Sequence, residues 1–292
     1  MDFEKYCRDE YIDYKVYSYL AKLEKNDERR GILENFGKME HEHYIFWKSL
    51  MNKEMKDSSL DNIRIKLFIL FKYIFGLIFT IKLMEKNEKR VIEEYKKLLN
   101  RLEGESKQKL ELIIKDEIEH ENFWMNQMKD DTTRYLGFII LGLADAIIEI
   151  TGVHAGFLGV TASTIIAGIA GLVVGISASL AMASAAYLQA KQSEGSNPRI
   201  SAIYTGVFYI LAAVALATPY FMTHDMLVAF LSSLIIAVML IGFFNFYSSV
   251  IFERKFAKEF LTSTTIILVT ASISFIVGEF LGNIFGIPQY FK

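Results

Sequence analysis

The charged residues of this chain are distributed unevenly, and this constrains its fold more than any other feature. Only 13 of the 66 Asp, Glu, Lys and Arg residues lie between Tyr135 and Lys292, although this stretch makes up more than half of the 292 residues. A chain in which a soluble domain is joined to a membrane domain has its charged residues distributed in this way, whereas a single soluble domain does not. We therefore predict two domains, 1–130 and 131–292.

The second domain contains apolar segments long enough to cross a bilayer. They cover about 135–158, 162–190, 202–222, 226–251 and 261–286. Lysine and arginine occur before the first segment (Lys129, Arg134), between the second and third, and between the fourth and fifth. The positive-inside rule therefore predicts a multi-pass protein of the cell membrane, with a cytoplasmic N-terminal domain and the C-terminus outside.

The first domain contains no proline, and its apolar residues recur at helical intervals. We predict amphipathic helices over about 3–25, 31–54 and 106–129, and a longer helical region over about 62–102. Within that region, Leu67–Ile81 is apolar except for Lys72. Fifteen residues are few for a membrane span, so we interpret this stretch as a helix on the membrane surface or in a partner interface. A full span is the less favoured alternative.

Composition excludes two further classes of protein. The single cysteine, Cys7, cannot form a disulfide framework or a cysteine-based zinc or iron–sulfur site. A pI near 6.3 with no block of basic residues argues against nucleic acid as a partner.

Two predicted helices of the first domain carry the same motif, Glu-x-x-His-x-x-x-Trp. The copies are Glu40-x-x-His43-x-x-x-Trp47 and Glu117-x-x-His120-x-x-x-Trp124. Residues at i and i+3 lie one turn apart on one helix face, so the Glu and His of each copy can bind the same site. One such motif is common on a solvated charged helix, whereas two copies with similar surroundings favour a metal site.

Further acids precede each motif by about thirty residues, namely Glu10 and the pair Glu85-x-x-Glu88. Four helices that offer Glu, Glu-x-x-His, Glu and Glu-x-x-His carry the ligand set of a carboxylate-bridged di-iron or di-manganese bundle. Carboxylates offset the repulsion between two cations, and neutral imidazoles complete the coordination without adding charge. The pattern predicts a di-metal site on these helices.

With these motifs, the first domain resembles the rubrerythrin branch of the ferritin-like family over about 1–130. The resemblance implies an all-α chain in which a ferritin-like four-helix bundle precedes the five-span membrane domain. It also implies a di-iron cofactor, with manganese as an alternative, and Glu40 and Glu117 as counterparts of the bridging pair. The implied metal ligands are Glu10, Glu40, His43, Glu85, Glu88, Glu117 and His120. The cysteine module that usually accompanies this family is absent, so no electron-transfer partner is built into the chain.

Ionisable residues inside the predicted spans are rare and usually functional. The first span carries Asp145 and Glu149, four residues apart and therefore on one helix face. Two stacked acids with no cation nearby in the sequence require a proton or a metal. The second span carries Met182, whose thioether would favour a softer transition metal over calcium or magnesium.

The membrane domain resembles the vacuolar iron transporter family over nearly its whole length. The resemblance rests on Gly142-Leu-Ala-Asp145, Thr151-Gly152, Ala155-Gly156, Ser179-Leu-Ala-Met182, Tyr187-Leu188 and Tyr204-Thr-Gly206. It implies that Asp145 and Met182 line a pathway for divalent iron or manganese. Ala186 departs from the family, because many prokaryotic relatives carry Glu at this position.

The two halves together resemble membrane-bound ferritin-like proteins, which are dimeric iron exporters. Our leading hypothesis is therefore a proton-coupled exporter in which the cytoplasmic domain captures or senses Fe²⁺, or Mn²⁺. Asp145, Glu149 and Met182 would then form the transport pathway of a homodimer in the lipid bilayer. Protonation of carboxylates releases a bound cation, so one pair of acids could couple the two flows.

Two alternatives remain open at the sequence level. The first is a membrane-anchored di-iron oxidase or peroxidase without transport, and ferroxidase activity in the first domain is also compatible with the transporter. An anchor alone does not require Asp145 and Glu149, which counts against this alternative. The second is a metal-sensing receptor that transports nothing.

Overall fold

The described part of the chain is helical throughout and contains no strand. The computed structural model describes residues 3–51, 54–55, 58–127, 131–192 and 195–291. Lys129 lies outside these residues, and the side chains of Trp124 and Arg134 lie outside the described part as well. The chain divides into two compact units, Met1–Lys129 and Asp130–Lys292.

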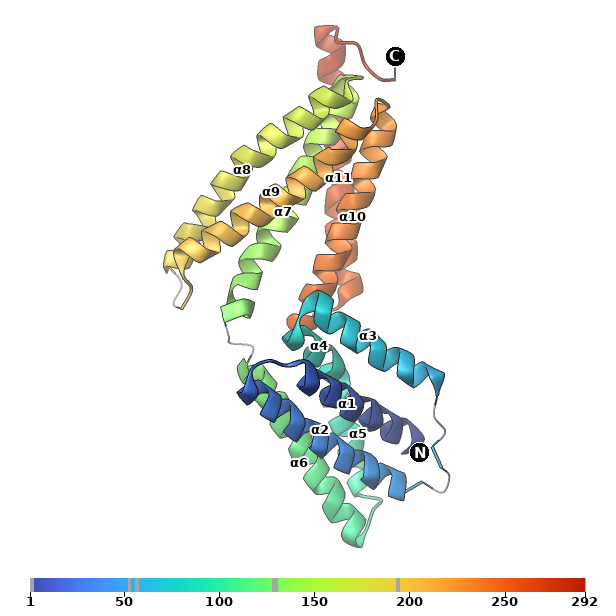
Figure 1. Ribbon diagram of the computed structural model, residues 1–292. Helices are drawn as coiled ribbons and strands as arrows, with labels where there is room; N and C mark the ends of the chain where they lie inside the picture. The colour runs from blue at the N-terminus through green and yellow to red at the C-terminus, as the bar shows by residue number, and fades with distance from the viewer. Residues whose placement is uncertain (1–2, 52–53, 56–57, 128–130, 193–194, 292) are drawn as a thin grey trace. The chain divides into compact units, whose positions relative to one another are not determined.

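The first unit is built from six α-helices and a short 3₁₀-helix among the described residues (Figure 1). They are α1 (Phe3–Leu23), α2 (Asp27–Ser49), α3 (Ser59–Phe75), α4 (Leu77–Met84), η1 (Glu85–Asn87), α5 (Glu88–Leu99) and α6 (Gly104–Gln127). Local chemistry sets several boundaries. The Asn26 side chain accepts a hydrogen bond from the Arg29 backbone at 2.9 Å and so caps α2, and Ser58 caps α3 in the same way at Leu60.

The region over 62–102, predicted to be helical, consists of three α-helices and a 3₁₀-helix, because the chain breaks at two points. Gly76 has φ of 89°, a backbone conformation that favours glycine, and it separates α3 from α4. The short η1 then separates α4 from α5. Leu67–Ile81 is therefore divided between two helices, and it is not among the helices long and apolar enough to span a membrane.

Two apolar clusters form the core of the first unit. The Leu20 cluster consists of Ile12, Val16, Tyr17, Leu20, Ala21, Leu33, Phe36, Ile65 and Ile81. The Trp47 cluster consists of Cys7, Phe46, Trp47, Ile92, Tyr95, Leu98, Leu110, Ile113 and Ile114. Helices α1 and α2 contribute to both clusters, so the segments of these helices between the clusters lie inside the unit.

The second unit contains five helices that are long and apolar enough to cross a membrane, among the residues described. They are α7 (Asp131–Val160), α8 (Thr164–Gln192), α9 (Pro198–Met222), α10 (Met226–Ile251) and α11 (Phe256–Phe285) (Figure 1). The chain therefore has the architecture of a multi-pass membrane protein. Helices α7, α9 and α11 begin up to five residues before the predicted apolar segments. At α9 the Asn197 side chain caps the helix and Pro198 occupies its first position.

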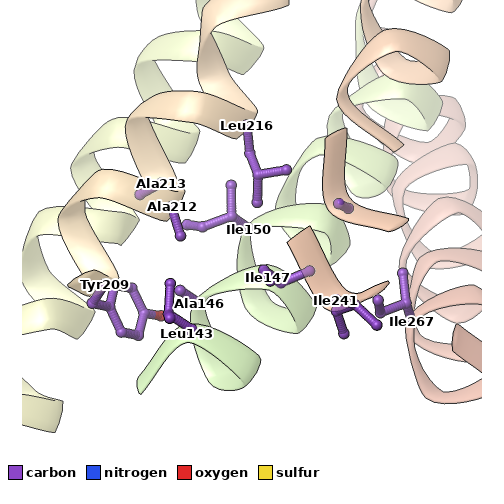
Figure 2. Close-up of a cluster of buried hydrophobic side chains, with 11 residues drawn as sticks. Leu143, Ala146, Ile147, Ile150, Tyr209, Ala212, Ala213, Leu216, Ile241 and Ile267 are labelled. Carbon is purple, nitrogen blue, oxygen red and sulfur yellow. The ribbon is translucent and has the colours of Figure 1, made fainter. Parts of the chain in front are cut away.

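Helix α7 lies at the centre of this unit. Its residues Leu143, Ala146, Ile147 and Ile150 pack against Tyr209 and other side chains of α9, and against α10 and α11 (Figure 2). Small residues allow the helices to approach closely. A Cβ atom added to Gly278 of α11 would lie 2.1 Å from the Gly156 oxygen of α7.

Two glycines of α8 also lie at contacts between helices. A Cβ atom on Gly171 would lie 2.3 Å from His154 Nε2, and one on Gly175 would lie 2.6 Å from the Ala213 Cβ atom. These glycines therefore allow the apolar helices to pack closely at these positions.

Candidate metal centre

Three helices of the first unit carry their predicted ligands at the boundary between the two apolar clusters. On α1, Glu10 lies between Cys7 of the Trp47 cluster and Ile12 of the Leu20 cluster. On α2, Glu40 and His43 lie between Phe36 and Phe46, which belong to different clusters. On α6, Glu117 and His120 follow the last residue of the Trp47 cluster and precede Phe123, which packs on the Leu20 cluster. Helix packing therefore brings the polar residues together in the interior.

Four of the predicted ligands form one buried group, namely Glu10, Glu40, His43 and Glu117. Each offers a ligand atom, and these atoms all lie within 4.8 Å of one another. His43 Nδ1 lies 3.6 Å from Glu10 Oε2, 3.4 Å from Glu40 Oε2 and 3.2 Å from Glu117 Oε1. A buried cluster of three carboxylates and one imidazole could hold a divalent cation.

Glu40 and Glu117 connect this group to the second histidine. Glu40 directs Oε2 toward His43 and Oε1 toward His120, whose Nδ1 lies 3.1 Å away. Glu117 likewise faces His43 with Oε1 and His120 with Oε2, at 3.2 and 3.9 Å. Each carboxylate therefore presents one oxygen to each histidine.

The unsatisfied polar atoms at this site fit a bound cation. His43 Nδ1 and both ring nitrogens of His120 are buried and have no hydrogen-bond partner, although carboxylate oxygens lie close to both rings. A buried polar atom without a hydrogen bond is costly to stability. A divalent cation between these nitrogens and oxygens would satisfy both, so the donor set present could hold a metal ion.

Other side chains hold the candidate ligands in place. Asp116 Oδ2 accepts a hydrogen bond from His43 Nε2 at 3.3 Å, which directs Nδ1 toward the carboxylates. The Tyr95 hydroxyl donates to Glu10 Oε1 at 2.7 Å. The sequence analysis missed both residues. Asp116 adjoins Glu117 in the sequence, but neither its spacing nor that of Tyr95 distinguishes it from other polar or aromatic helix residues.

Glu85 and Glu88 lie at the 3₁₀-helix that connects α4 to α5. Glu85 begins η1 and Glu88 begins α5. The Tyr17 hydroxyl donates to Glu85 Oε1 at 2.7 Å, and Glu88 Oε2 is buried without a hydrogen-bond partner. A 3₁₀ turn between two helices often marks a functional position. The two acids adjoin the four-residue group but are not members of it.

The carboxyl groups around the site repel one another. Burial raises the pKa of Glu10, Glu85 and Glu88 well above the ordinary value, and the charges of neighbouring carboxylates add to this shift. Glu40 differs, because the adjacent His120 and His43 outweigh the effect of burial and hold its pKa below the usual range. Without a cation the site therefore retains protons.

The pKa values of the two histidines shift in the opposite direction from those of ordinary buried imidazoles. Burial by itself lowers the pKa of His43, but Asp116 and the three glutamates around it outweigh burial and raise it well above its ordinary value. The pKa of His120 is raised for the same reason, chiefly by Glu40. Cation binding would have to displace these protons.

A cavity of about 100 Å³ leads into this site. Its lining includes Glu10, Glu40, Glu88, Glu117 and Asp13. Asp13 follows Glu10 by one helical turn, and burial together with the charges of Glu40 and Glu10 raises its pKa well above normal. Asp13 is a further acidic residue that the sequence analysis missed, although its i, i+3 spacing from Glu10 was a visible signal.

In the second unit, the predicted pathway residues lie close to the centre of the helix packing. Asp145 and Glu149 are half-buried on α7, and Glu149 accepts a hydrogen bond from the Tyr209 hydroxyl of α9. Met182 of α8 packs against the cluster that contains Tyr209. Glu149 thus contacts Tyr209, a member of the cluster against which Met182 packs, and the sequence analysis did not single out this tyrosine.

No protein-family model matches this chain, and no curated protein is significantly similar to it.

Proposed function

We propose that this protein is a proton-coupled divalent-metal exporter with Fe²⁺, or Mn²⁺, as its cargo. The observation that carries the proposal is the buried group of Glu10, Glu40, His43 and Glu117 in a chain that also has five helices of membrane-spanning character. The first unit would be a cytoplasmic ferritin-like bundle that captures or senses the metal. The second unit would carry the cargo across the bilayer.

The residues of the first unit support capture in the following way. Glu40 and Glu117 each face both histidines, so they can hold two neighbouring cations with one oxygen each. Glu85 and Glu88 adjoin this group and would complete a di-metal site together with His120. Protonated carboxyl groups would release their protons as the cation enters, so binding would weaken at low pH.

The residues of α7 support passage through the membrane unit. Asp145 and Glu149 lie one turn apart on α7, and a pair of acids inside a span is costly unless it has a functional partner. Both are only half-buried in the single chain, so a second copy could cover them and form a shared pathway in a homodimer. Met182 would add a soft ligand near the same place.

Flux measurements on the full chain in liposomes test the proposal. Purified protein should move Fe²⁺, kept reduced, or Mn²⁺ in response to a pH gradient, and Asp145→Ala should abolish the flux. Glu279→Ala is a matched control, because Glu279 is an exposed acid on α11. Undiminished transport by Asp145→Ala would refute the proposed pathway.

The same preparations distinguish the exporter from a membrane-anchored oxidase. An oxidase would consume oxygen or peroxide with Fe²⁺ and would lose this activity in Glu40→Ala but not in Asp145→Ala. It would also show no metal flux. Glu42→Ala provides the control for the first unit, since Glu42 is exposed and lies two residues from Glu40.

A further inference from the structure

Helix α3 presents an apolar stripe to the outside of the first unit. The side chains on this stripe are about half exposed or more, from 44% for Leu67 to 69% for Leu60. They follow one another at intervals of three and four residues and therefore share one face of the helix. The stripe consists of Leu60, Ile63, Leu67, Leu70 and Ile74.

The opposite face of α3 attaches the helix firmly to its own unit. Asp61 is buried and forms an ion pair with Arg8 of α1. Ile65 is only 6% exposed and belongs to the Leu20 cluster, against which Phe68 also packs. The orientation of α3 about its own axis is thus fixed, and the apolar stripe cannot turn inward.

Basic residues flank the stripe. Arg64 and Lys66 are exposed beside it, and Arg64 also forms an ion pair with Asp9 of α1, with 3.2 Å between Nη1 and Oδ1. The acid of this helix, Asp61, is buried on the inner face. The long side chains of the two basic residues can extend past an apolar surface and place their charges at its edge. The outer face of α3 therefore combines an apolar centre with a positive margin.

This charge pattern favours an anionic lipid surface over a second copy of the chain. A helical seam between two copies is usually stabilised by opposite charges beside the apolar residues, and here both flanking charges are positive. The stripe extends over only about two heptads, whereas coiled coils generally need at least three or four. A specific protein interface also usually takes roughly 20–30 residues from each partner, more than the stripe offers.

The short connection between the two units also favours a lipid surface as the binding partner of the stripe. Helix α6 ends at Gln127 and α7 begins at Asp131, so the chain passes within a few residues from the first unit into a helix of membrane-spanning character. A connection of this length reaches at most about 14 Å. The first unit is therefore tethered close to a bilayer surface, where a lipid-binding face would be used.

We propose that α3 is an interfacial helix that docks on the anionic surface of the bilayer. Leu67 and its neighbours on the stripe would enter the boundary between headgroups and acyl chains, with Lys66 at the lipid phosphates. This docking does not depend on metal binding, so it can fail or hold independently of the proposed export function.

Fluorescent labels on single cysteines test the proposal in the full chain. Cys7 is the one native cysteine and is fully buried, so a thiol-reactive environment-sensitive dye should label introduced cysteines selectively. The variants are Leu67→Cys and Leu70→Cys on the stripe, with Asn62→Cys as the matched control, because Asn62 is an exposed polar residue of the same helix. Unmodified protein measures any residual labelling of Cys7.

The labelled proteins are reconstituted in vesicles of phosphatidylcholine and phosphatidylglycerol that contain a lipid with a nitroxide near its headgroup. We expect the nitroxide to quench the dye at Leu67 and Leu70 by about twofold or more, and the dye at Asn62 far less. Lys66→Glu, or vesicles without phosphatidylglycerol, should reduce the quenching.

Two results would overturn the proposal. Equal, weak quenching at all three positions would place the stripe in water. Disulfide cross-linking between copies at Leu67→Cys, without quenching in the corresponding labelled protein, would assign the stripe to a dimer contact instead.

Discussion

Glu40 and His120, eighty residues apart in the sequence, meet in the interior of the first unit with 3.1 Å between Oε1 and Nδ1. Both residues are almost completely buried, and His120 Nδ1 nevertheless has no hydrogen-bond partner. Helix periodicity explains why each residue faces inward. Their approach without a hydrogen bond is the geometry expected of two ligands that share a cation, and it leads to several predictions.

Asp116→Asn should weaken metal binding by about 10- to 100-fold without removing a ligand, because the Asp116 carboxylate orients the His43 ring. Isothermal titration with Mn²⁺ measures the change in affinity. Glu119→Gln is the control, since Glu119 is exposed on the same helix. An equal loss of affinity in both variants would show that general surface charge, and not ring orientation, determines binding.

The metal-free first unit should become less stable as the pH rises from about 5 to 8. The pKa values of Glu10, Glu88 and His43 are raised in the folded state, so the folded chain binds more protons than the unfolded chain in this range. Proton binding therefore favours folding at low pH, and this contribution is lost as the pH passes through the raised pKa values. Glu40, with a lowered pKa, contributes stability that is lost only on further acidification.

Thermal unfolding monitored by tryptophan fluorescence checks this prediction, because Trp47 lies in the cluster next to the site. The measurement is made with a chelator and repeated with saturating Mn²⁺, which should weaken or reverse the dependence on pH. A metal-free midpoint that rises with pH would contradict the proposed repulsion among the buried carboxylates.

Gly278→Ala should destabilise the second unit by about 1–3 kcal/mol, the usual cost of overpacking. The added methyl group would collide with the Gly156 oxygen, and backbone atoms cannot move aside as a flexible side chain can. Thermal unfolding in detergent measures the effect. Gly137→Ala is the matched control, because a Cβ atom at Gly137 meets nothing within 4 Å.

Tyr209→Phe should reduce metal flux several-fold if Glu149 acts in the proposed pathway, because it removes the hydroxyl that donates to this carboxylate. The liposome assay compares it with Tyr187→Phe, which alters an exposed tyrosine on α8. Equal flux in the two variants and the parent would mean that the bond between Tyr209 and Glu149 serves stability alone.

Several features of the fold were predictable because they depend on local periodicity and length. The five apolar segments appear as helices of spanning length, and the two Glu-x-x-His motifs face the interior as their spacing requires. Leu67–Ile81 is divided between two helices, which was not predicted. Its hydrophobicity was visible, but whether Gly76 would bend the chain depended on backbone torsion and on the packing of α4, which sequence periodicity does not describe.

The sequence by itself determined which residues share a helix face, since an α-helix repeats every 3.6 residues whatever surrounds it. It thereby determined that Glu40 and His43 lie on one helix face, and likewise Glu117 and His120. Only the tertiary structure decided that these two pairs meet, and that Asp116 and Tyr95 support them. Contacts between distant helices depend on how apolar faces fit against each other, and that fit is a property of the folded chain.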